Sequence, residues 1–289
     1  PATKSSPLSR KNWKHRRGKK LFLTLPLLLA LLAAAGWILL LRFENRQLYH
    51  PTAALDATPA QFQLRYQDVQ FSAADGTPLF GWWIPANRPR GTVVYCHGNA
   101  GNIGGRAHLA PEFTKRGFNL FLWDYRGYGR SGGRPTEKGL YADARAAYDA
   151  AEAMSRKLPV IAYGHSLGAA VAIQLAQDRP LAGLVVQGGF ASMADMAKRR
   201  YPALPLDRVL TVKFDAAAGA AALTNLPKLF GHSLTDDVVP FPSGRILHAA
   251  AAEPKTFVLL SGAHSDVSWF VPGGAGNAEL EAFLAAYKP

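Results

Sequence analysis

The sequence predicts an α/β domain with a mostly parallel sheet that helices cover on both faces. Short continuous apolar runs recur along the chain, and segments with helical patterning separate most of them. Strands buried on both faces have such continuous runs, whereas a half-exposed sheet would alternate apolar and polar residues. One run leads through Gly164-His165-Ser166-Leu167-Gly168 into a helical segment, which indicates a tight strand-to-helix turn with a serine at its centre.

The composition is that of a globular protein with a large apolar core. Of 289 residues, 48% are hydrophobic and 18% are charged, which excludes a disordered chain and allows one large domain or two small ones. The single cysteine, Cys96, excludes an internal disulfide and a cysteine-based metal cluster. Because Cys96 lies in an apolar run, we expect a buried core thiol.

Most of the net charge of +13 lies at the N-terminus. Residues 1–20 contain eight lysines and arginines and no acidic residue, so 25 basic residues stand against 20 acidic ones in the remainder. The folded part is only mildly basic, which argues against a nucleic-acid-binding protein. The tail has a single aromatic residue, Trp13, and joins an apolar stretch directly. We expect it to set membrane topology or to attract anionic lipid headgroups.

Residues 21–41 form an uncharged, mainly apolar stretch. As a helix it would extend for about 30 Å, the thickness of the hydrocarbon layer of a bilayer. A cleaved signal peptide is the main alternative, and Ala33-Ala34-Ala35 could imitate its cleavage site. Because the apolar stretch continues through Trp37–Leu41, we predict an uncleaved transmembrane anchor. The basic tail, 1–20, is then expected in the cytoplasm, and the rest of the chain beyond the membrane.

An irregular linker is expected over 42–66, because Pro51 and Pro59 discourage a continuous helix. The folded domain should occupy 67–289 and open with a hairpin around the turn signal Asp75-Gly76. The strands of this hairpin are Asp68–Phe71 and Leu79–Ile84, the further strands are Thr92–Cys96, Asn119–Trp123, Val160–Tyr163, Leu184–Val186, Lys228–Phe230 and Thr256–Leu260, and the clearest helices are Glu137–Met154 and Ala169–Gln177.

Ser166 is the candidate nucleophile. A turn that exposes it between a strand and a helix needs neighbours without bulky side chains, and Gly164 and Gly168 provide them. The helix that follows directs its unsatisfied N–H groups toward the serine, where negative charge would develop during acyl transfer. The alternative is a structural turn serine, which the flanking pattern disfavours.

Two later loops offer the partners that a serine nucleophile requires. A serine hydroxyl reacts only if a base takes its proton and a third group orients the base. His264 follows the last predicted strand and is the candidate base, while Asp236 or the adjacent Asp237 follows the strand before it. This gives the chain order nucleophile, acid, base. His165 and His232 are expected to be structural.

The oxyanion of a tetrahedral intermediate needs at least two hydrogen-bond donors. We expect one from the backbone N–H of Leu167, the residue after the nucleophile. The second should come from the loop His97-Gly98-Asn99-Ala100-Gly101-Asn102, where the N–H of Asn99 is the candidate. This loop lacks the glycine spacing and the Gly-Lys-Ser/Thr ending of a phosphate-binding loop.

Together with the elbow, three motifs carry a family resemblance: the loop His97–Asn102, the segment Asp124-Tyr125-Arg126-Gly127-Tyr128-Gly129-Arg130-Ser131, and Asp236 with Val239-Pro240. From about Val69 onward the chain resembles the α/β-hydrolase superfamily, and more narrowly the membrane-anchored serine hydrolases of the BEM46-like group. The resemblance implies an eight-stranded, mostly parallel sheet and the triad Ser166, Asp236 and His264. It also implies that Asp124 and Arg126 order a loop. The chain departs from the family pattern at Ser233 and Ala263, where the family usually has glycine.

The segment 190–225 is where such hydrolases insert a lid, and here we expect only a short helical excursion. Phe190 and Trp269 could line an apolar substrate pocket, although aromatic residues at such positions are as often core residues.

The sequence therefore predicts a membrane-anchored serine hydrolase that cleaves carboxylic esters or thioesters through an acyl-enzyme. The expected partners are a small-molecule or lipid-like acyl substrate and the bilayer through 21–41, with no cofactor, no metal and no nucleic acid. A peptidase or amidase of the same fold, or a non-catalytic membrane-tethered binding module, is the alternative.

Overall fold

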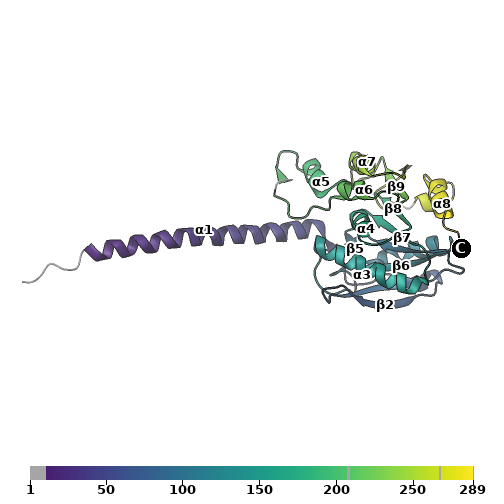
Figure 1. Ribbon diagram of the computed structural model, residues 1–289, viewed down its shortest axis with the longest axis horizontal. Coiled ribbons are helices and arrows are strands. Elements are labelled where there is room, and N and C mark those ends of the chain that lie inside the picture. The colour runs from purple at the N-terminus through teal and green to yellow at the C-terminus, as the bar shows by residue number, and fades with distance from the viewer. Residues whose placement is uncertain (1–10, 207–208, 267, 289) are drawn as a thin grey trace, which may run out of the picture. The chain divides into compact units, whose positions relative to one another are not determined.

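The computed structural model describes residues 11–206, 209–266 and 268–288 (Figure 1). The chain divides into two compact units, residues 1–47 and residues 48–289. The predicted basic tail over 1–20 falls partly on residues 1–10, which lie outside the described part.

The first unit is built on one long helix, α1 (Lys11–Leu48). Its Pro26–Leu48 portion is long and apolar enough to cross a membrane, a property that a signal sequence near an N-terminus shares. The helix runs seven residues past the predicted apolar stretch, so the first part of the expected irregular linker is helical. Residues 42–48 contain no glycine or proline and include the good helix formers Arg, Gln and Leu, which explains this difference.

The second unit contains a sheet of eight strands in which β3 is antiparallel to both of its neighbours, β2 and β6, and the other neighbouring strands pair in parallel. This confirms the predicted mostly parallel sheet, and each predicted strand lies inside an observed one. In spatial order the strands are β10 (Lys255–Leu260), β9 (Lys228–Ser233), β8 (Gly183–Gln187), β7 (Val160–His165), β4 (Gly91–Cys96), β6 (Phe118–Asp124), β3 (Pro78–Ile84) and β2 (Gln67–Ser72).

Two hydrophobic cores lie on opposite faces of this sheet, as the side chains of β4 illustrate. Val94 and Cys96 point into one core, and Val93 and Tyr95 point into the other. The first core is covered by α3 (Glu137–Ser155), α4 (Leu167–Asp178), α6 (Ala216–Ala222) and α7 (Phe241–Ala250). The second is covered by η2 (Ile103–Leu109), α2 (Ala110–Thr114) and α8 (Asn277–Ala285). Helices on both faces were predicted, and the buried strands are accordingly mostly apolar.

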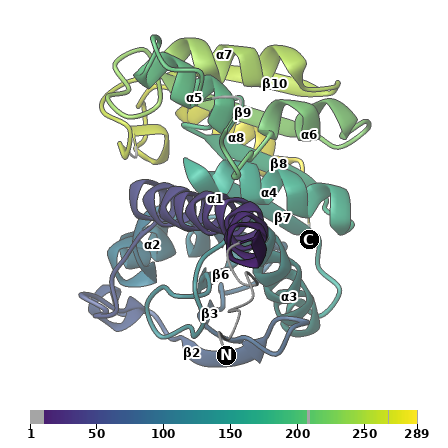
Figure 2. The same ribbon diagram turned by 90° about the vertical axis from the view of Figure 1, so that its left-hand side faces the viewer.

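The two ends of the sheet differ in what surrounds them (Figure 2). Helices α6 and α7 lie near β8, β9 and β10, whereas β2 forms the opposite edge. Helix α5 (Met193–Arg200) and α6 lie in the predicted lid segment, 190–225. The segment that follows α1 contributes the short strand β1 (His50–Pro51), which pairs in parallel with β5 (Ala100–Gly101), and then η1 (Pro59–Phe62). Another short helix, η4 (Ser268–Phe270), precedes α8.

Candidate active site

Ser166 occupies a sharp turn between the end of β7 and the first residue of α4. Its backbone has φ 56° and ψ −120°, a conformation that residues with a side chain rarely adopt. The turn is held by two backbone hydrogen bonds: Ser166 N–H donates to the Gln187 carbonyl (2.9 Å), and its carbonyl accepts from Ala169 N–H (2.9 Å). Strain of this kind persists where surrounding contacts fix it, and it is typical of functional sites.

Contact with neighbouring backbone explains the two glycines of the Gly-x-Ser-x-Gly motif. A Cβ on Gly168 would lie 1.9 Å from the carbonyl oxygen of Cys96, and one on Gly164 would lie 2.4 Å from the carbonyl oxygen of Gly168. Side chains at these positions would therefore push α4 away from the ends of β4 and β7. The glycines let the helix start directly behind Ser166.

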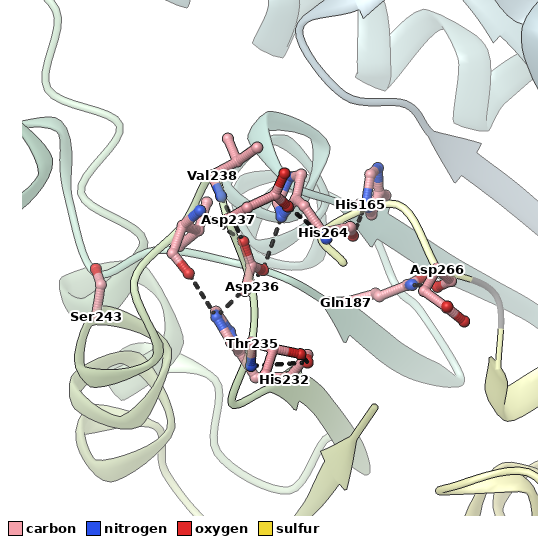
Figure 3. A network of polar contacts seen from close by, with 12 residues as sticks. His165, Gln187, His232, Thr235, Asp236, Asp237, Val238, Ser243, His264 and Asp266 are labelled. Carbon is pink, nitrogen blue, oxygen red and sulfur yellow. Dashed lines mark hydrogen bonds and ion pairs between the residues drawn. The ribbon is translucent and has the colours of Figure 1, made fainter. Parts of the chain in front are cut away.

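The side chains of Asp236 and His264 form a buried pair (Figure 3). They follow the carboxyl ends of β9 and β10, as Ser166 follows the carboxyl end of β7. His264 Nδ1 lies 2.7 Å from Asp236 Oδ2. The other carboxylate oxygen of Asp236 accepts from the N–H groups of Val238 (2.9 Å) and Val239 (2.7 Å). Burial raises the pKa of Asp236, but the hydrogen bond from His264 and the two backbone N–H groups outweigh burial and hold it below its usual value. Asp236 is thus an ionised acceptor for the imidazole.

Asp237 has a different partner. Its Oδ1 accepts a hydrogen bond from the backbone N–H of His264 (3.0 Å), and this bond lowers the pKa of the exposed Asp237 carboxyl. Of the two adjacent aspartates, only Asp236 contacts the ring of His264. This arrangement supports Asp236 as the orienting acid.

His264 is oriented so that its second ring nitrogen is free. Nε2 is buried and has no hydrogen-bond partner among the residues that the structure describes. With the proton on Nδ1 facing Asp236, Nε2 keeps a lone pair that can accept a proton.

His165 connects the base to the elbow. Its Nε2 lies 3.1 Å from the carbonyl oxygen of His264, and the two rings are 4.9 Å apart. Burial lowers the pKa of His165 to about 3, so this ring is neutral and can donate from Nε2. His165 directly precedes Ser166, so its hydrogen bond holds the backbone of His264 beside the serine turn. His232, the other histidine expected to be structural, lies 2.9 Å from the Val239 carbonyl through Nε2, next to Asp236.

The predicted oxyanion loop, His97–Asn102, packs against the elbow. A Cβ on Gly98 would lie 3.3 Å from His165 Nδ1 and 3.5 Å from the Cβ of Ser166, so the backbone of the loop lies directly against the elbow. The hydroxyl of Tyr125 donates to the His97 carbonyl (2.9 Å), and that of Tyr128 donates to the Asn99 carbonyl (2.8 Å). These bonds fix the backbone of the loop from the segment that follows β6.

The N–H groups of Asn99 and Leu167 have no backbone acceptor within the described residues. Leu167 is the first residue of α4, where an N–H has no partner inside the helix. Both groups are therefore free to bind a developing oxyanion.

Asp124 and Arg126 order the surrounding turn. Asp124 Oδ1 accepts from Ile103 N–H (2.9 Å), at the end of the oxyanion loop. Arg126 pairs with the fully buried Asp143 on α3 (2.7 Å) and with Asp75 in the hairpin turn (2.8 Å). These contacts agree with the loop-ordering role that the family resemblance implies.

A second set of contacts to the oxyanion loop has no signal in the sequence. The side-chain amide of Asn99 donates to the Leu48 carbonyl (2.9 Å), and His50 N–H donates to the Asn99 carbonyl (2.9 Å). The Asn102 amide donates to the carbonyls of Thr52 (3.0 Å) and Ala54 (2.5 Å). We call residues 48–54 the clamp segment. It lies in the predicted irregular linker, and nothing in its composition indicates where it docks.

Phe190 and Trp269 belong to the two hydrophobic cores. Trp269 is fully buried and donates from Nε1 to the hydroxyl of Tyr163 (3.0 Å). Phe190 is 3% exposed and packs in the opposite core. Core packing is therefore the role that the structure shows for both side chains. Within the described residues no cluster of histidine, cysteine and acidic side chains could hold a metal ion.

Comparison with known proteins places the chain in a family. A family model described as serine aminopeptidase, S33, matches residues 87–214. The uncharacterized protein Rv2307c of Mycobacterium tuberculosis is 40% identical over 241 residues, which cover 81% of this chain and 85% of that protein. Protein bem46 of Schizosaccharomyces pombe is 32% identical over 211 residues, or 68% of this chain and 70% of its own. An esterase of Pyrococcus furiosus superposes with a TM-score of 0.69 over 84% of this chain and 98% of its own, at 18% identity. The chain therefore belongs to the Bem46 family of α/β hydrolases.

Proposed function

We propose that this α/β hydrolase is a membrane-anchored enzyme that cleaves carboxylic ester or thioester bonds through an acyl-enzyme on Ser166. The observation that carries the proposal is the pair Asp236–His264, 2.7 Å apart. The second ring nitrogen of His264 is buried and has no partner among the described residues, and the His264 ring lies 4.9 Å from that of His165, which precedes the strained Ser166. A base oriented by a carboxylate, with its other nitrogen free, is what a serine nucleophile requires.

In the first half of the reaction, Ser166 Oγ attacks the acyl carbon and its proton passes to His264 Nε2. The carbonyl oxygen becomes an oxyanion, which accepts hydrogen bonds from the N–H groups of Leu167 and Asn99. Collapse of this intermediate breaks the bond to the leaving group. The imidazolium of His264 then gives its proton to the departing alcohol or thiol.

In the second half, water attacks the acyl group on Ser166 while His264 Nε2 takes one of its protons. The second tetrahedral intermediate uses the same two N–H donors. It collapses to the free carboxylic acid as the proton returns to Ser166 Oγ. Throughout, Asp236 keeps the imidazole in the tautomer that leaves Nε2 available and stabilises its charged form.

The membrane part of the proposal rests on α1. Eight basic residues precede the apolar stretch, which favours an N-terminus in the cytoplasm and a catalytic domain on the other side of the bilayer. Deleting residues 1–47 removes the whole first unit and leaves the second intact. The truncated protein should move from the membrane fraction to the soluble fraction, and its continued sedimentation with membranes would contradict the anchor.

A peptidase or amidase activity is the second candidate, because the matching family model is described as a serine aminopeptidase. The fold neighbour from Pyrococcus furiosus is described as an esterase, which favours ester hydrolysis over peptide hydrolysis. Both reactions use the same triad, so the leaving group is the point to test.

A fluorophosphonate probe and two substrate series test the proposal. Wild-type protein should be labelled and Ser166→Ala should not, while Ser265→Ala is the matched control because this serine is exposed on the loop of the base. Hydrolysis should be faster for p-nitrophenyl esters and acyl thioesters than for aminoacyl p-nitroanilides. Equal labelling of Ser166→Ala would refute the nucleophile, and faster anilide hydrolysis would favour the peptidase.

A further inference from the structure

The clamp segment, residues 48–54, joins the candidate membrane helix directly to the oxyanion loop. Leu48 is the last residue of α1, and its carbonyl accepts the hydrogen bond from the Asn99 side chain. Two residues later, β1 pairs with β5 next to Asn99. The end of the apolar helix is thus bonded to the residue whose N–H is a candidate oxyanion donor, whatever direction the helix takes.

The contacts of the clamp segment are specific and numerous. Asn102 Nδ2 donates to the Thr52 carbonyl, the Thr52 hydroxyl and the Ala54 carbonyl. Thr52 also donates from its N–H to the Gly101 carbonyl (3.2 Å) and accepts from Gly129 N–H (2.9 Å). The side chains of Asn99 and Asn102 in the oxyanion loop therefore both donate hydrogen bonds to this segment. Such a dense set of bonds fixes the clamp segment, which begins at the last residue of α1, to the oxyanion loop.

Helix geometry limits how far the site can lie from a bilayer that α1 crosses. The uncharged stretch ends at Leu41, and Leu48 follows seven residues later in the same helix, so Leu48 lies within about 10 Å of the hydrocarbon layer. Asn99 contacts Leu48, and Gly98 contacts the elbow. Adding the lengths of these contacts to the 3.8 Å between consecutive Cα atoms places Ser166 within roughly another 20 Å. The headgroup layer itself is about 5–8 Å thick on each side.

Exposed apolar side chains also flank the acid of the triad. Leu234 and Val238, two residues before and after Asp236, are 61% and 55% exposed. An acyl chain or a membrane surface at this loop would cover both side chains.

We propose, on the basis of the serine hydrolase function above, that the substrate is an amphiphile held in the same bilayer as α1, with its acyl ester or thioester at the membrane surface. The clamp segment keeps the oxyanion loop and Ser166 at this surface. Membrane-held esters therefore reach the site at a high local concentration, while a soluble ester gains no such advantage.

A rigid spacer tests this proposal. Insertion of a 20-residue helical (Glu-Ala-Ala-Ala-Lys)₄ segment between Gln47 and Leu48 would lift the clamp segment by about 30 Å without changing any of its bonds. The matched control carries the same spacer between Arg10 and Lys11, on the other side of the span. Both full-length variants and the wild type are reconstituted into vesicles that contain a fluorogenic lipid ester, with p-nitrophenyl butyrate as the soluble substrate.

We expect the spacer at 47/48 to lower hydrolysis of the vesicle-held ester at least tenfold and to leave butyrate hydrolysis within about twofold of wild type. The control spacer should change neither rate. Unchanged hydrolysis of the vesicle-held ester in the 47/48 variant would overturn the inference. Absence of hydrolysis of both substrates by the wild type would instead refute the serine hydrolase function, so the two failures are distinguishable.

A second measurement uses the wild type alone and so does not depend on how the variant folds. Protein and fluorogenic lipid ester are placed either in the same vesicles or in separate vesicles that are then mixed. The proposal requires hydrolysis at least tenfold faster when both share one bilayer. Equal rates in the two arrangements would show that the substrate is taken from solution, which contradicts the proposal.

Discussion

Replacing Asp236 or Asp237 by asparagine separates two adjacent carboxylates that the structure gives different tasks. In Asp236→Asn, the amide oxygen can still accept the N–H groups of Val238 and Val239, so the loop should keep its shape. The amide nitrogen then faces His264 Nδ1, where a carboxylate oxygen stood 2.7 Å away. Because an amide NH₂ donates, Nδ1 must become the acceptor and the ring proton moves to Nε2. A protonated Nε2 cannot take the proton of Ser166.

The expected loss of activity in Asp236→Asn is large, because the imidazole is held in the tautomer that cannot act as a base. In a serine protease the same change lowers kcat about 10⁴-fold, which corresponds to about 5.5 kcal/mol of transition-state stabilisation. In Asp237→Asn, by contrast, the amide oxygen can still accept the backbone N–H of His264, so the rate should stay close to that of the wild type. The assay is kcat/KM on p-nitrophenyl butyrate, with thermal melting to confirm folding. A large loss in Asp237→Asn with little loss in Asp236→Asn would refute the assignment of the acid.

Three further predictions concern the framework of the site. Gly168→Ala should abolish fluorophosphonate labelling and lower the melting temperature, because its Cβ would lie 1.9 Å from a carbonyl oxygen of β4, whereas Gly105→Ala, with open space around it, should do neither. Asp143→Ala should destabilise the fold by about 1–3 kcal/mol, because Arg126 loses its hydrogen bonds to the buried Asp143 and keeps only the exposed Asp75 as its partner. Asp149→Ala breaks an exposed pair and should change the melting temperature little. The pKa of His165 is lowered from 6.5 to about 3, so the unfolded chain binds an extra proton between these values and stability should fall as pH drops below 6.5. The fall in melting temperature between pH 7 and pH 5 should be smaller in His165→Gln, and an unchanged fall would contradict this role.

The strands were predictable because parallel strands buried on both faces need unbroken apolar runs. The apolar runs, from Thr92–Cys96 to Thr256–Leu260, are short and are followed by loop residues. This favours strands over buried helices. Boundaries were less certain: β7 extends to His165 and β9 to Ser233, where polar residues continue the strand. Backbone pairing with the neighbouring strand, and not side-chain polarity, decides where such strands end.

The position of α1 was predicted only in part. Its apolar stretch is evident from composition. Its end at Leu48 depends on where residues 42–48, which contain no proline, meet His50, which pairs with Ala100 of β5. The clamp segment could not be predicted, because a hydrogen bond from Asn99 to the carbonyl of Leu48 joins residues 51 positions apart and uses a backbone group that every residue has. Only the asparagine side chains carry sequence information, and they do not specify their partner.

The position of His264 shows why the three residues of the proposed triad alone do not define this site. The chain order of Ser166, Asp236 and His264 indicates three loops at one edge of the sheet, but it does not say how the loop of His264 is held. In the structure both backbone groups of His264 are engaged by side chains: its N–H donates to Asp237 and its carbonyl lies 3.1 Å from His165 Nε2. Each of these two residues is the chain neighbour of a triad member. The chain neighbours of the proposed nucleophile and acid are therefore the groups that fix the backbone of His264. A short loop without regular structure can then hold an imidazole in one orientation. Both backbone groups of His264 are hydrogen-bonded, and its ring contacts Asp236 as well.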